Sequence, residues 1–147
     1  SPDKKYLVSG GTVTDLWCEE RIELGIRYTA AFAKLKRMNE AYDAFEDTLR
    51  VIEQIMFVTD EEFKIGCSSP ALKEFTLECE INWIEKDGKE YKEISMLHNG
   101  WWIWIVPLDY QKVFKRDCFD IMRADKRFDS LFERLDKCVI YRSLPTG

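Results

Sequence analysis

Residues 75–106 read FTLECEINWIEKDGKEYKEISMLHNGWWIWIV, and this stretch decides the fold. It carries two turn sequences, Asp87-Gly88 and Asn99-Gly100, between segments in which apolar and polar residues alternate. Asp-Gly and Asn-Gly suit the two-residue turns of antiparallel hairpins, because both turn residues there need positive φ. The stretch therefore predicts an antiparallel meander of three strands.

A turn centred on Asp87-Gly88 also fixes the register of the first hairpin. It pairs Cys79 with Met96, Ile81 with Ile94 and Trp83 with Lys92. One predicted face carries Leu77, Cys79, Ile81, Trp83, Ile94 and Met96. The other carries Glu78, Glu80, Asn82, Glu93 and Ser95, with Ile84 and Tyr91 beside the turn.

The third strand, Trp101 to Val106, is apolar on both sides. The same alternation places Trp102 and Trp104 on the otherwise polar face, beside Leu97. A strand with two apolar sides is either covered on both sides or exposes apolar surface that favours association. The sequence leaves open whether C-terminal helices cover these two indoles.

Residues 31–56 predict one long helix over 30–57, because apolar residues recur at steps of three and four. These residues are Ala31, Leu35, Met38, Tyr42, Phe45, Leu49, Ile52 and Met56. Two further sets at helical spacing predict a C-terminal helical pair, or one kinked helix, over 109–138. They comprise Tyr110, Val113, Phe114, Cys118, Ile121 and Met122, then Phe128, Leu131, Phe132, Leu135 and Cys138 or Val139.

Residues 14–28 are open between strand and helix. Strict alternation over 21–28 favours a strand, with Thr29 as the N-cap of the long helix. Strands are also predicted at Lys5 to Val8 and near Val139 to Tyr141, and Thr59 to Glu62 has the spacing of a capping box that opens a helical turn. The predicted fold class is α+β, with the antiparallel meander packed against one long helix and a C-terminal helical pair.

The length of 147 residues predicts a single domain over 1–147. No apolar run approaches the roughly 20 residues of a transmembrane helix, and the first residues lack the apolar core of a signal peptide. The five cysteines are widely spaced, without a C-x-x-C pair, which argues against a disulfide framework or a zinc site. We therefore expect reduced thiols, no metal, no cofactor, no membrane association and a cytoplasmic location.

The net charge of −5 is uneven along the chain. Residues 1–93 hold 20 acidic and 13 basic side chains, a balance of −7, whereas residues 94–147 hold 7 acidic and 9 basic, a balance of +2. This acidity argues against direct binding to nucleic acid and is compatible with a basic protein partner.

The sequence contains few residues in patterns that are typical of catalytic sites. His98 is the single histidine, which leaves few routes to a triad or a histidine metal site. Glu90 and Lys92 form an E-x-K pattern of the metal-nuclease type, but the predicted register places Glu78 and Glu80 on the opposite face. We assign no catalytic and no metal-binding residue.

Two sets of residues are candidates for binding. The first is an aromatic patch or pocket formed by Trp102, Trp104, Tyr91, Leu97 and Tyr110. The second is an acidic surface formed by Glu78, Glu80, Glu93, Asp43, Glu46 and Asp47.

These sets favour a non-enzymatic protein-binding module, of the inhibitor or adaptor type, that acts through an acidic surface and exposed aromatics. In one version it occludes a basic site of its partner. The alternatives are a small-molecule-binding domain with an aromatic-lined pocket, then a carboxylate- or cysteine-dependent enzyme. Partner and oligomeric state stay open.

Overall fold

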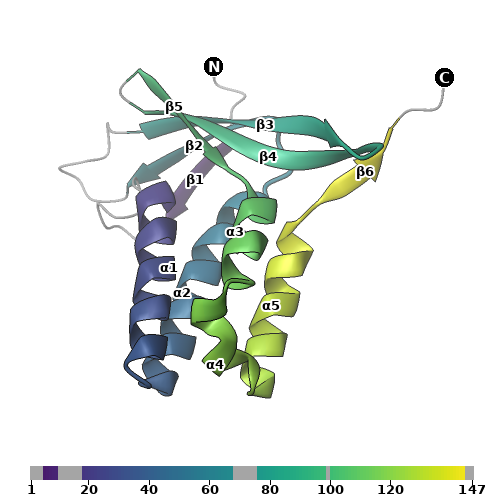
Figure 1. Ribbon diagram of the computed structural model, residues 1–147. Coiled ribbons are helices and arrows are strands. Elements are labelled where there is room, and N and C mark those ends of the chain that lie inside the picture. Colours follow the sequence, from purple (N-terminus) through teal and green to yellow (C-terminus); the bar gives the residue numbers. More distant parts are fainter. Residues whose placement is uncertain (1–4, 10–17, 68–75, 99, 145–147) are drawn as a thin grey trace. The chain divides into compact units, whose positions relative to one another are not determined.

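The computed structural model describes residues 5–9, 18–67, 76–98 and 100–144 (Figure 1). Its contacts divide the chain into two compact units. The sheet unit comprises residues 1–19, 58–105 and 141–147, and the helical unit comprises residues 20–57 and 106–140. Each unit is assembled from separate segments of the chain, so the expectation of a single domain stays a prediction. The α+β class is confirmed.

The sheet unit contains six strands. They are β1 (Lys5–Ser9), β2 (Glu62–Cys67), β3 (Thr76–Lys86), β4 (Lys89–His98), β5 (Trp101–Ile105) and β6 (Tyr141–Ser143). The order across the sheet is β1-β2-β3-β4-β5. The strand β5 pairs with residues 94–98 of β4, and β6 pairs with residues 89–91 of β4. The predicted meander is confirmed as β3 to β5. The sheet is mixed, however, because β1 runs parallel to β2.

The predicted register of the first hairpin is confirmed. Asp87 and Gly88 both have positive φ, at 52° and 78°, as the two-residue turn requires. Ile81 pairs with Ile94, and the pairs Cys79–Met96 and Trp83–Lys92 also form as predicted. The helical turn predicted at Thr59 to Glu62 is wrong, because β2 begins at Glu62.

The register separates the two faces of the sheet. The apolar face carries a set of buried side chains: Phe63, Ile65, Leu77, Cys79, Ile94, Met96 and Ile105. The opposite face, here called the indole face, carries Trp102 and Trp104. Period-two alternation along β3 and β4 generates both faces from one hairpin.

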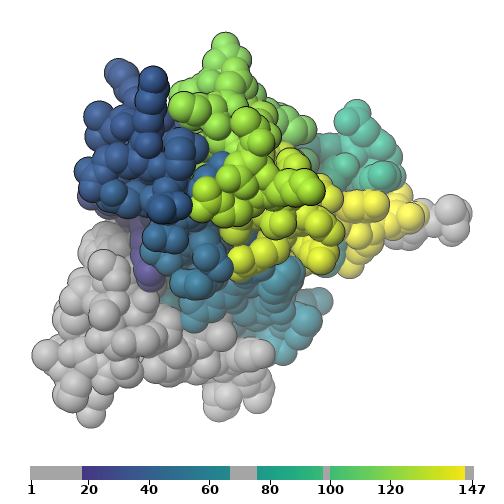
Figure 2. Space-filling view, turned by 90° about the horizontal axis from the view of Figure 1, so that it is seen from below, coloured from purple at the N-terminus to yellow at the C-terminus, as the bar shows by residue number. Residues whose placement is uncertain are grey.

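The helical unit differs from the single long helix and helical pair that the sequence predicted. Its elements are α1 (Cys18–Lys34), α2 (Met38–Met56), α3 (Pro107–Phe114), the 3₁₀ turn η2 (Asp117–Phe119), α4 (Asp120–Arg123) and α5 (Lys126–Cys138). Cys18 and Glu19, the first residues of α1, group with the sheet unit. In Figure 2 the blue surface of α1 and α2 lies beside the green surface of the segment that holds α3 and α4.

The predicted long helix is interrupted at Lys36. Its φ of 60° is left-handed, and the amide of Arg37 donates to the carbonyl of Phe32 while that of Lys36 donates to Ala33. This pattern is a Schellman motif, which ends α1 and lets α2 start at Met38. The predicted stripe is buried at Tyr42, Phe45, Leu49, Ile52 and Met56, whereas Ala31 and Leu35 are exposed.

The strand predicted over 21–28 is wrong, because these residues belong to α1. The buried positions of α1 are Cys18, Ile22, Thr29 and Ala33, with Gly25 half-buried among them. Their spacing of three and four is helical, but most of these side chains are small. Thr29 is not an N-cap, since its hydroxyl donates to the carbonyl of Gly25 within α1 at 2.7 Å.

Aromatic side chains form the centre of the helical unit. Phe45 of α2 stacks on Phe114 of α3, with ring centroids 4.2 Å apart, and meets Phe128 of α5 edge-on at 5.6 Å. The Tyr42 hydroxyl donates to the carbonyl of Met122 at 2.7 Å. Arg134 of α5 forms ion pairs with Glu53 and Glu46 of α2, at 2.6 Å and 3.3 Å. Stacking, hydrogen bonding and ion pairing thus join α2 to the C-terminal helices.

Gly25 allows α1 and α2 to approach closely. A Cβ added there would overlap the hydroxyl oxygen of Thr48 and lie 3.0 Å from its Cβ. Thr48 is buried, and its hydroxyl donates to the carbonyl of Ala44 at 2.7 Å, so it has little room to move. Close packing at this point therefore requires glycine.

We predict that Gly25→Ala lowers the free energy of unfolding by about 1–3 kcal/mol, because the added methyl overpacks the contact with Thr48. Helix propensity alone would raise it by about 1 kcal/mol, so the sign of the change discriminates between the two effects. Urea denaturation measures both. Thr48→Ala should cost less in the Gly25→Ala background than in the wild type, and strict additivity would contradict the packing account.

Candidate functional site

Two tryptophans lie side by side with apolar neighbours on the indole face. Trp102 pairs with Leu97, and Trp104 pairs with Ser95. The indoles are 48% and 53% exposed, respectively, so they are only partly covered.

A second apolar area lies on the indole face nearer the turn, and Ser95, Asn82 and Glu93 separate it from the tryptophans. Tyr91 pairs with Ile84 of β3 and with Tyr141 of β6. The two tyrosine rings lie 5.7 Å apart, and Lys89 Nζ lies 4.4 Å from the Tyr141 ring centroid. The sequence placed Tyr91 in the patch, but Tyr141 could not be found before the β4–β6 pairing was known.

Carboxylates share this face. Glu78 pairs with Leu97 and Glu80 with Ser95, and both glutamates are exposed. Glu93 was expected on the same acidic surface, but it is only 9% exposed and its carboxylate lies 3.9 Å from Lys86 Nζ. Of the predicted acidic residues, Glu78 and Glu80 are the exposed ones here, with Glu62 beside Glu80 and Lys64 beside Glu78 on the neighbouring strand.

The other predicted site residues belong to the helical unit. Tyr110 is half-buried on α3, and no pairing in the sheet includes it. Asp43 and Asp47 are exposed on α2. Glu46 is half-buried and contacts both Arg134 and Arg50, at 3.3 Å and 3.2 Å. The residues that the sequence grouped as one acidic surface therefore belong to two different units.

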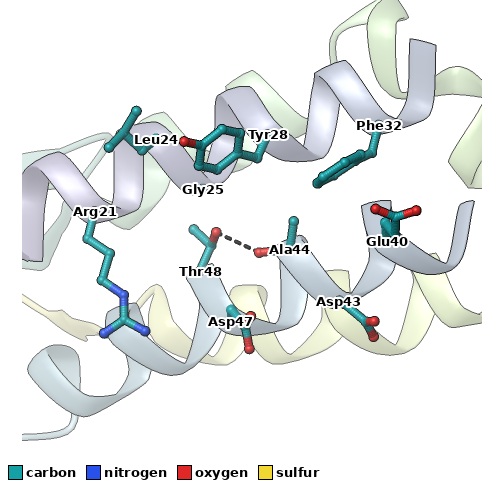
Figure 3. Close-up of a pocket in the computed structure, with 10 residues that line it drawn as sticks. All are labelled: Arg21, Leu24, Gly25, Tyr28, Phe32, Glu40, Asp43, Ala44, Asp47 and Thr48. Carbon is teal, nitrogen blue, oxygen red and sulfur yellow. Dashed lines mark hydrogen bonds between the residues drawn. The ribbon is translucent and has the colours of Figure 1, made fainter. Parts of the chain in front are cut away.

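A groove lies between α1 and α2, with a volume of about 420 Å³ (Figure 3). Large apolar side chains of α1 form one wall, and Ala44, Thr48 and Glu40 of α2 face it, whereas the Asp43 and Asp47 carboxylates point away from α1. The lining residues are Arg21, Leu24, Gly25, Tyr28, Phe32, Glu40, Asp43, Ala44, Asp47 and Thr48. Sequence analysis missed the α1 wall because it assigned these residues to a strand.

The carboxylates of this groove differ in their partners. Glu40 forms two hydrogen bonds of 2.6 Å with the guanidinium of Arg37, and Arg37 lies 5.3 Å from the Phe32 ring centroid. Asp47 pairs with Arg50 at 3.1 Å. Both ion pairs are on the surface, where such pairs contribute little stability.

A second hollow, of about 450 Å³, lies near α3 and α5. It is lined by Lys115, Arg123, Phe128, Asp129, Phe132, Glu133 and Asp136. Arg123 donates to the carbonyls of Phe114 and Arg116 and to Asp120, and Asp136 accepts from Gln111 at 2.8 Å. These polar groups are engaged in holding the helices together, so this hollow is a weaker candidate than the α1–α2 groove.

The E-x-K pattern does not assemble a metal site. Glu90 pairs with Arg142 at 3.0 Å, and the guanidinium of Arg142 lies 4.1 Å from the Trp83 ring. Lys92 is buried on the apolar face, where its ammonium donates to the carbonyl of Val58. Across the described residues, no group of three or more His, Cys, Asp and Glu side chains has metal-binding geometry.

The cysteines give little support to nucleophilic chemistry. Burial raises the pKa of Cys79, and burial with a smaller contribution from Glu53 raises the pKa of Cys138 to about 12. Both thiols are therefore protonated at neutral pH and are weak nucleophiles. Cys118 is exposed, and the His98 side chain lies outside the described part of the structure.

Comparison with known proteins identified no relative: no family model, no curated protein and no solved structure matches this chain. Among the described helices, none is both long and apolar enough to cross a membrane. The function must therefore be argued from the surfaces themselves.

Lys92 generates a prediction about pH. Burial lowers its pKa below the usual 10.5, so the unfolded chain binds more protons than the folded chain between the folded-state pKa and 10.5. The contribution of Lys92 to stability therefore rises with pH across that window. The free energy of unfolding of the wild type minus that of Lys92→Met should increase as the pH is raised from about 7 toward 10.

Chemical denaturation at several pH values measures this difference. Lys89→Met, which removes an exposed lysine from the same strand, controls for the loss of one positive charge. A difference between wild type and Lys92→Met that stays constant or falls with pH would contradict the assignment of a destabilised ammonium.

Proposed function

We propose that this protein is a non-enzymatic protein-binding module, of the inhibitor or adaptor type, that contacts its partner through the indole face. The observation that carries the proposal is the exposure of Trp102 and Trp104 on the face that also presents Glu78 and Glu80. Trp and Tyr are the residues most enriched at the energetic centres of protein interfaces.

The exposed indoles have no evident role in stabilising the sheet. Trp102 and Trp104 remain about half exposed, Leu97 lies beside Trp102, and Ile84 and Tyr91 form a second apolar area nearer the turn on the same face. Exposed apolar side chains that gather on one face are costly in water and typically mark a site of association. A partner that covers it would gain the free energy of burying the rings.

The charges beside the indoles favour a basic partner. Glu78 and Glu80 flank the apolar surface, and the whole chain carries a net charge of −5. Carboxylates at the rim of an interface speed association with positive surfaces and oppose contact with phosphates. In the specific form of the proposal, the indole face occludes a basic site on the partner.

The proposal includes a cytoplasmic location. It is supported by the reduced thiols of Cys79, Cys118 and Cys138 within the described residues, since paired cysteines are the norm in oxidising compartments. Small-molecule binding is the second candidate, and the α1–α2 groove rather than the surroundings of Trp102 and Trp104 favours it. An enzyme is the third, for which the described side chains offer no converging set of reactive groups.

Paired tryptophan variants test the indole face. The partner is first captured from the native cell and then purified, and its affinity is measured by titration calorimetry. Trp102→Thr/Trp104→Thr should weaken binding at least tenfold, roughly the cost of losing one interface anchor. Threonine keeps the β propensity of the strand.

Trp101→Thr is the matched control. Trp101 lies on the same strand and is the most exposed of the three indoles at 76%, but its side chain points to the opposite face. It should leave the affinity within about twofold of the wild type. Equal losses in the control and the double variant would contradict the proposal, as would full affinity in the double variant.

Charge-removing variants test whether the partner's surface is positively charged. Glu78→Gln/Glu80→Gln should weaken binding and reduce its dependence on salt between about 0.05 M and 0.5 M, because fewer charges are then screened. Glu85→Gln, from the opposite face of β3, should change neither quantity. An affinity that does not depend on salt would rule out the basic partner and leave only the apolar contact.

A further inference from the structure

We propose that the outer edge of β5 binds an extended segment of the protein partner as an added antiparallel strand, with basic side chains over Trp102 and Trp104. This inference rests on the proposed function, because it names the part of the partner that meets the indole face. It adds a second kind of contact, since the backbone of β5 takes part as well as its indoles.

The hydrogen-bond ladder of β3 and β4 alternates from the Asp87-Gly88 turn. Residues that flank a two-residue turn form a hydrogen-bonded pair, and bonded and non-bonded pairs then alternate along the two strands. Every second residue of β4, from Lys89 to Leu97, therefore directs its backbone N–H and C=O toward β3. The alternate residues of β3 face β2 instead, and the amide of Ile81 indeed donates to the carbonyl of Glu61 on that side at 2.9 Å.

The same alternation leaves the outer edge of β5 open. The intervening residues of β4, among them Met96, direct their backbone groups toward β5, so Ile103 bonds to β4. Trp102 and Trp104 alternate with Ile103, and their N–H and C=O groups therefore point away from β4. Within the described residues β5 pairs with β4 alone, and its side chains are exposed or half-buried from Trp101 to Trp104. An edge of this kind is a template for another strand.

The strand β6 shows how this edge of β4 holds a short strand. It pairs with residues 89–91 of β4, on the side that β5 occupies further along at residues 94–98 (Figure 1). All three residues of β6 are exposed. The guanidinium of Arg142 nevertheless contacts Glu90 at 3.0 Å and lies 4.1 Å from the Trp83 ring centroid. Backbone pairing and a basic side chain over an indole thus act together.

The strand β5 combines the same two features. Residues of an added strand that bond to Trp102 and Trp104 would place their side chains on the indole face, because directly opposed residues share a face. The indoles attract cations there, and Glu78 and Glu80 add negative potential on the same face. A second copy of the chain would instead bring an uncharged β5 and a net charge of −5. The edge therefore fits an extended segment with Lys or Arg at every second residue.

Five-residue peptides test the edge on the full chain. The probe is N-acetyl-Thr-Arg-Val-Arg-Thr-amide, in which residues of high β propensity separate the arginines. In the matched neutral peptide, glutamine replaces both arginines. NMR of the protein amides reports the affinity and the residues affected. The amides of Trp102 and Trp104 should shift and exchange more slowly on binding, and the arginine peptide should bind about fivefold more tightly than the glutamine peptide.

Backbone methylation of the probe separates strand addition from side-chain contact. N-methyl groups on the two arginines remove the donors that would face β5 and should weaken binding at least tenfold. N-methyl groups on the valine and the last threonine are the matched control. The N–H groups of those residues point away from β5, so the affinity should stay within about twofold of that of the unmodified peptide.

The variant Trp102→Thr/Trp104→Thr tests the indoles separately from the backbone. It should bring the affinities of the arginine and glutamine peptides within about twofold of each other. Methylation of the arginines should still weaken binding, because the backbone edge is retained.

Four results would overturn the inference. The two methylated peptides could bind equally well, or the glutamine peptide could bind as tightly as the arginine peptide. The affected amides could lie outside β5. Finally, sedimentation could show that the chain alone forms a dimer that the arginine peptide dissociates, which would assign the edge to a second copy.

Competition with the captured partner distinguishes this inference from the proposed function. The arginine peptide should displace the partner. A partner whose affinity depends on Trp102 and Trp104 but which the peptide does not displace would contradict the added strand and leave the proposed function standing. A partner insensitive to both the peptide and the tryptophan variant would contradict the proposed function itself.

Discussion

The positive φ angles of Asp87 and Gly88 are the constraint on which the sheet unit depends. A two-residue turn with both residues in the left-handed region matches the twist of its flanking strands and allows one register. A slip by one residue would exchange the faces of every side chain on β4 and β5. Trp102 and Trp104 would then share a face with Leu77 and Cys79 of β3 in place of Glu78 and Glu80, and the indole face as described would not exist.

The strand β5 shows the cost of such a surface. Its sequence, Trp101 to Ile105, contains no charge, no proline and no glycine, the usual protections of a sheet edge. Within the described residues it pairs only with β4. Glu78 and Glu80, two strands away on the indole face, provide charge where β5 provides none. The same carboxylates that would select a basic partner therefore also oppose self-association of an acidic chain.

The hairpin and α2 could be predicted from the sequence because each rests on a local pattern with one solution. The Asp-Gly turn fixes the register, and the large apolar residues of α2 recur with helical spacing. The helix α1 could not be predicted in the same way. Its buried stripe uses small residues, Cys18, Gly25 and Ala33, and the need for glycine at position 25 shows only once Thr48 of α2 is packed against it. Lys36 adopts the left-handed conformation that ends α1, a position that glycine usually occupies, so no signal in the sequence marked a break there.

Because residues 21–28 were predicted as a strand, the groove between α1 and α2 was not predicted either. Ile22, Leu24, Ile26 and Tyr28 alternate with polar residues because α1 has two apolar lines, one packed against α2 and one open in the groove. Two adjoining helical lines produce the alternation of a strand over eight residues. Periodicity over so short a window could not separate these cases.

Charge counted along the sequence also misrepresents the charge that a partner meets. The balance of −7 over residues 1–93 includes Glu46 and Glu53, which Arg134 from the C-terminal segment compensates. It also includes Glu93, which is buried near Lys86. The carboxylates that remain exposed are spread over both units, among them Glu61, Glu62, Glu78 and Glu80 in the sheet unit and Asp43 and Asp47 on α2. Only Glu78 and Glu80 share a face with the exposed indoles, and this adjacency, more than the net charge, makes the indole face a candidate for binding a basic partner.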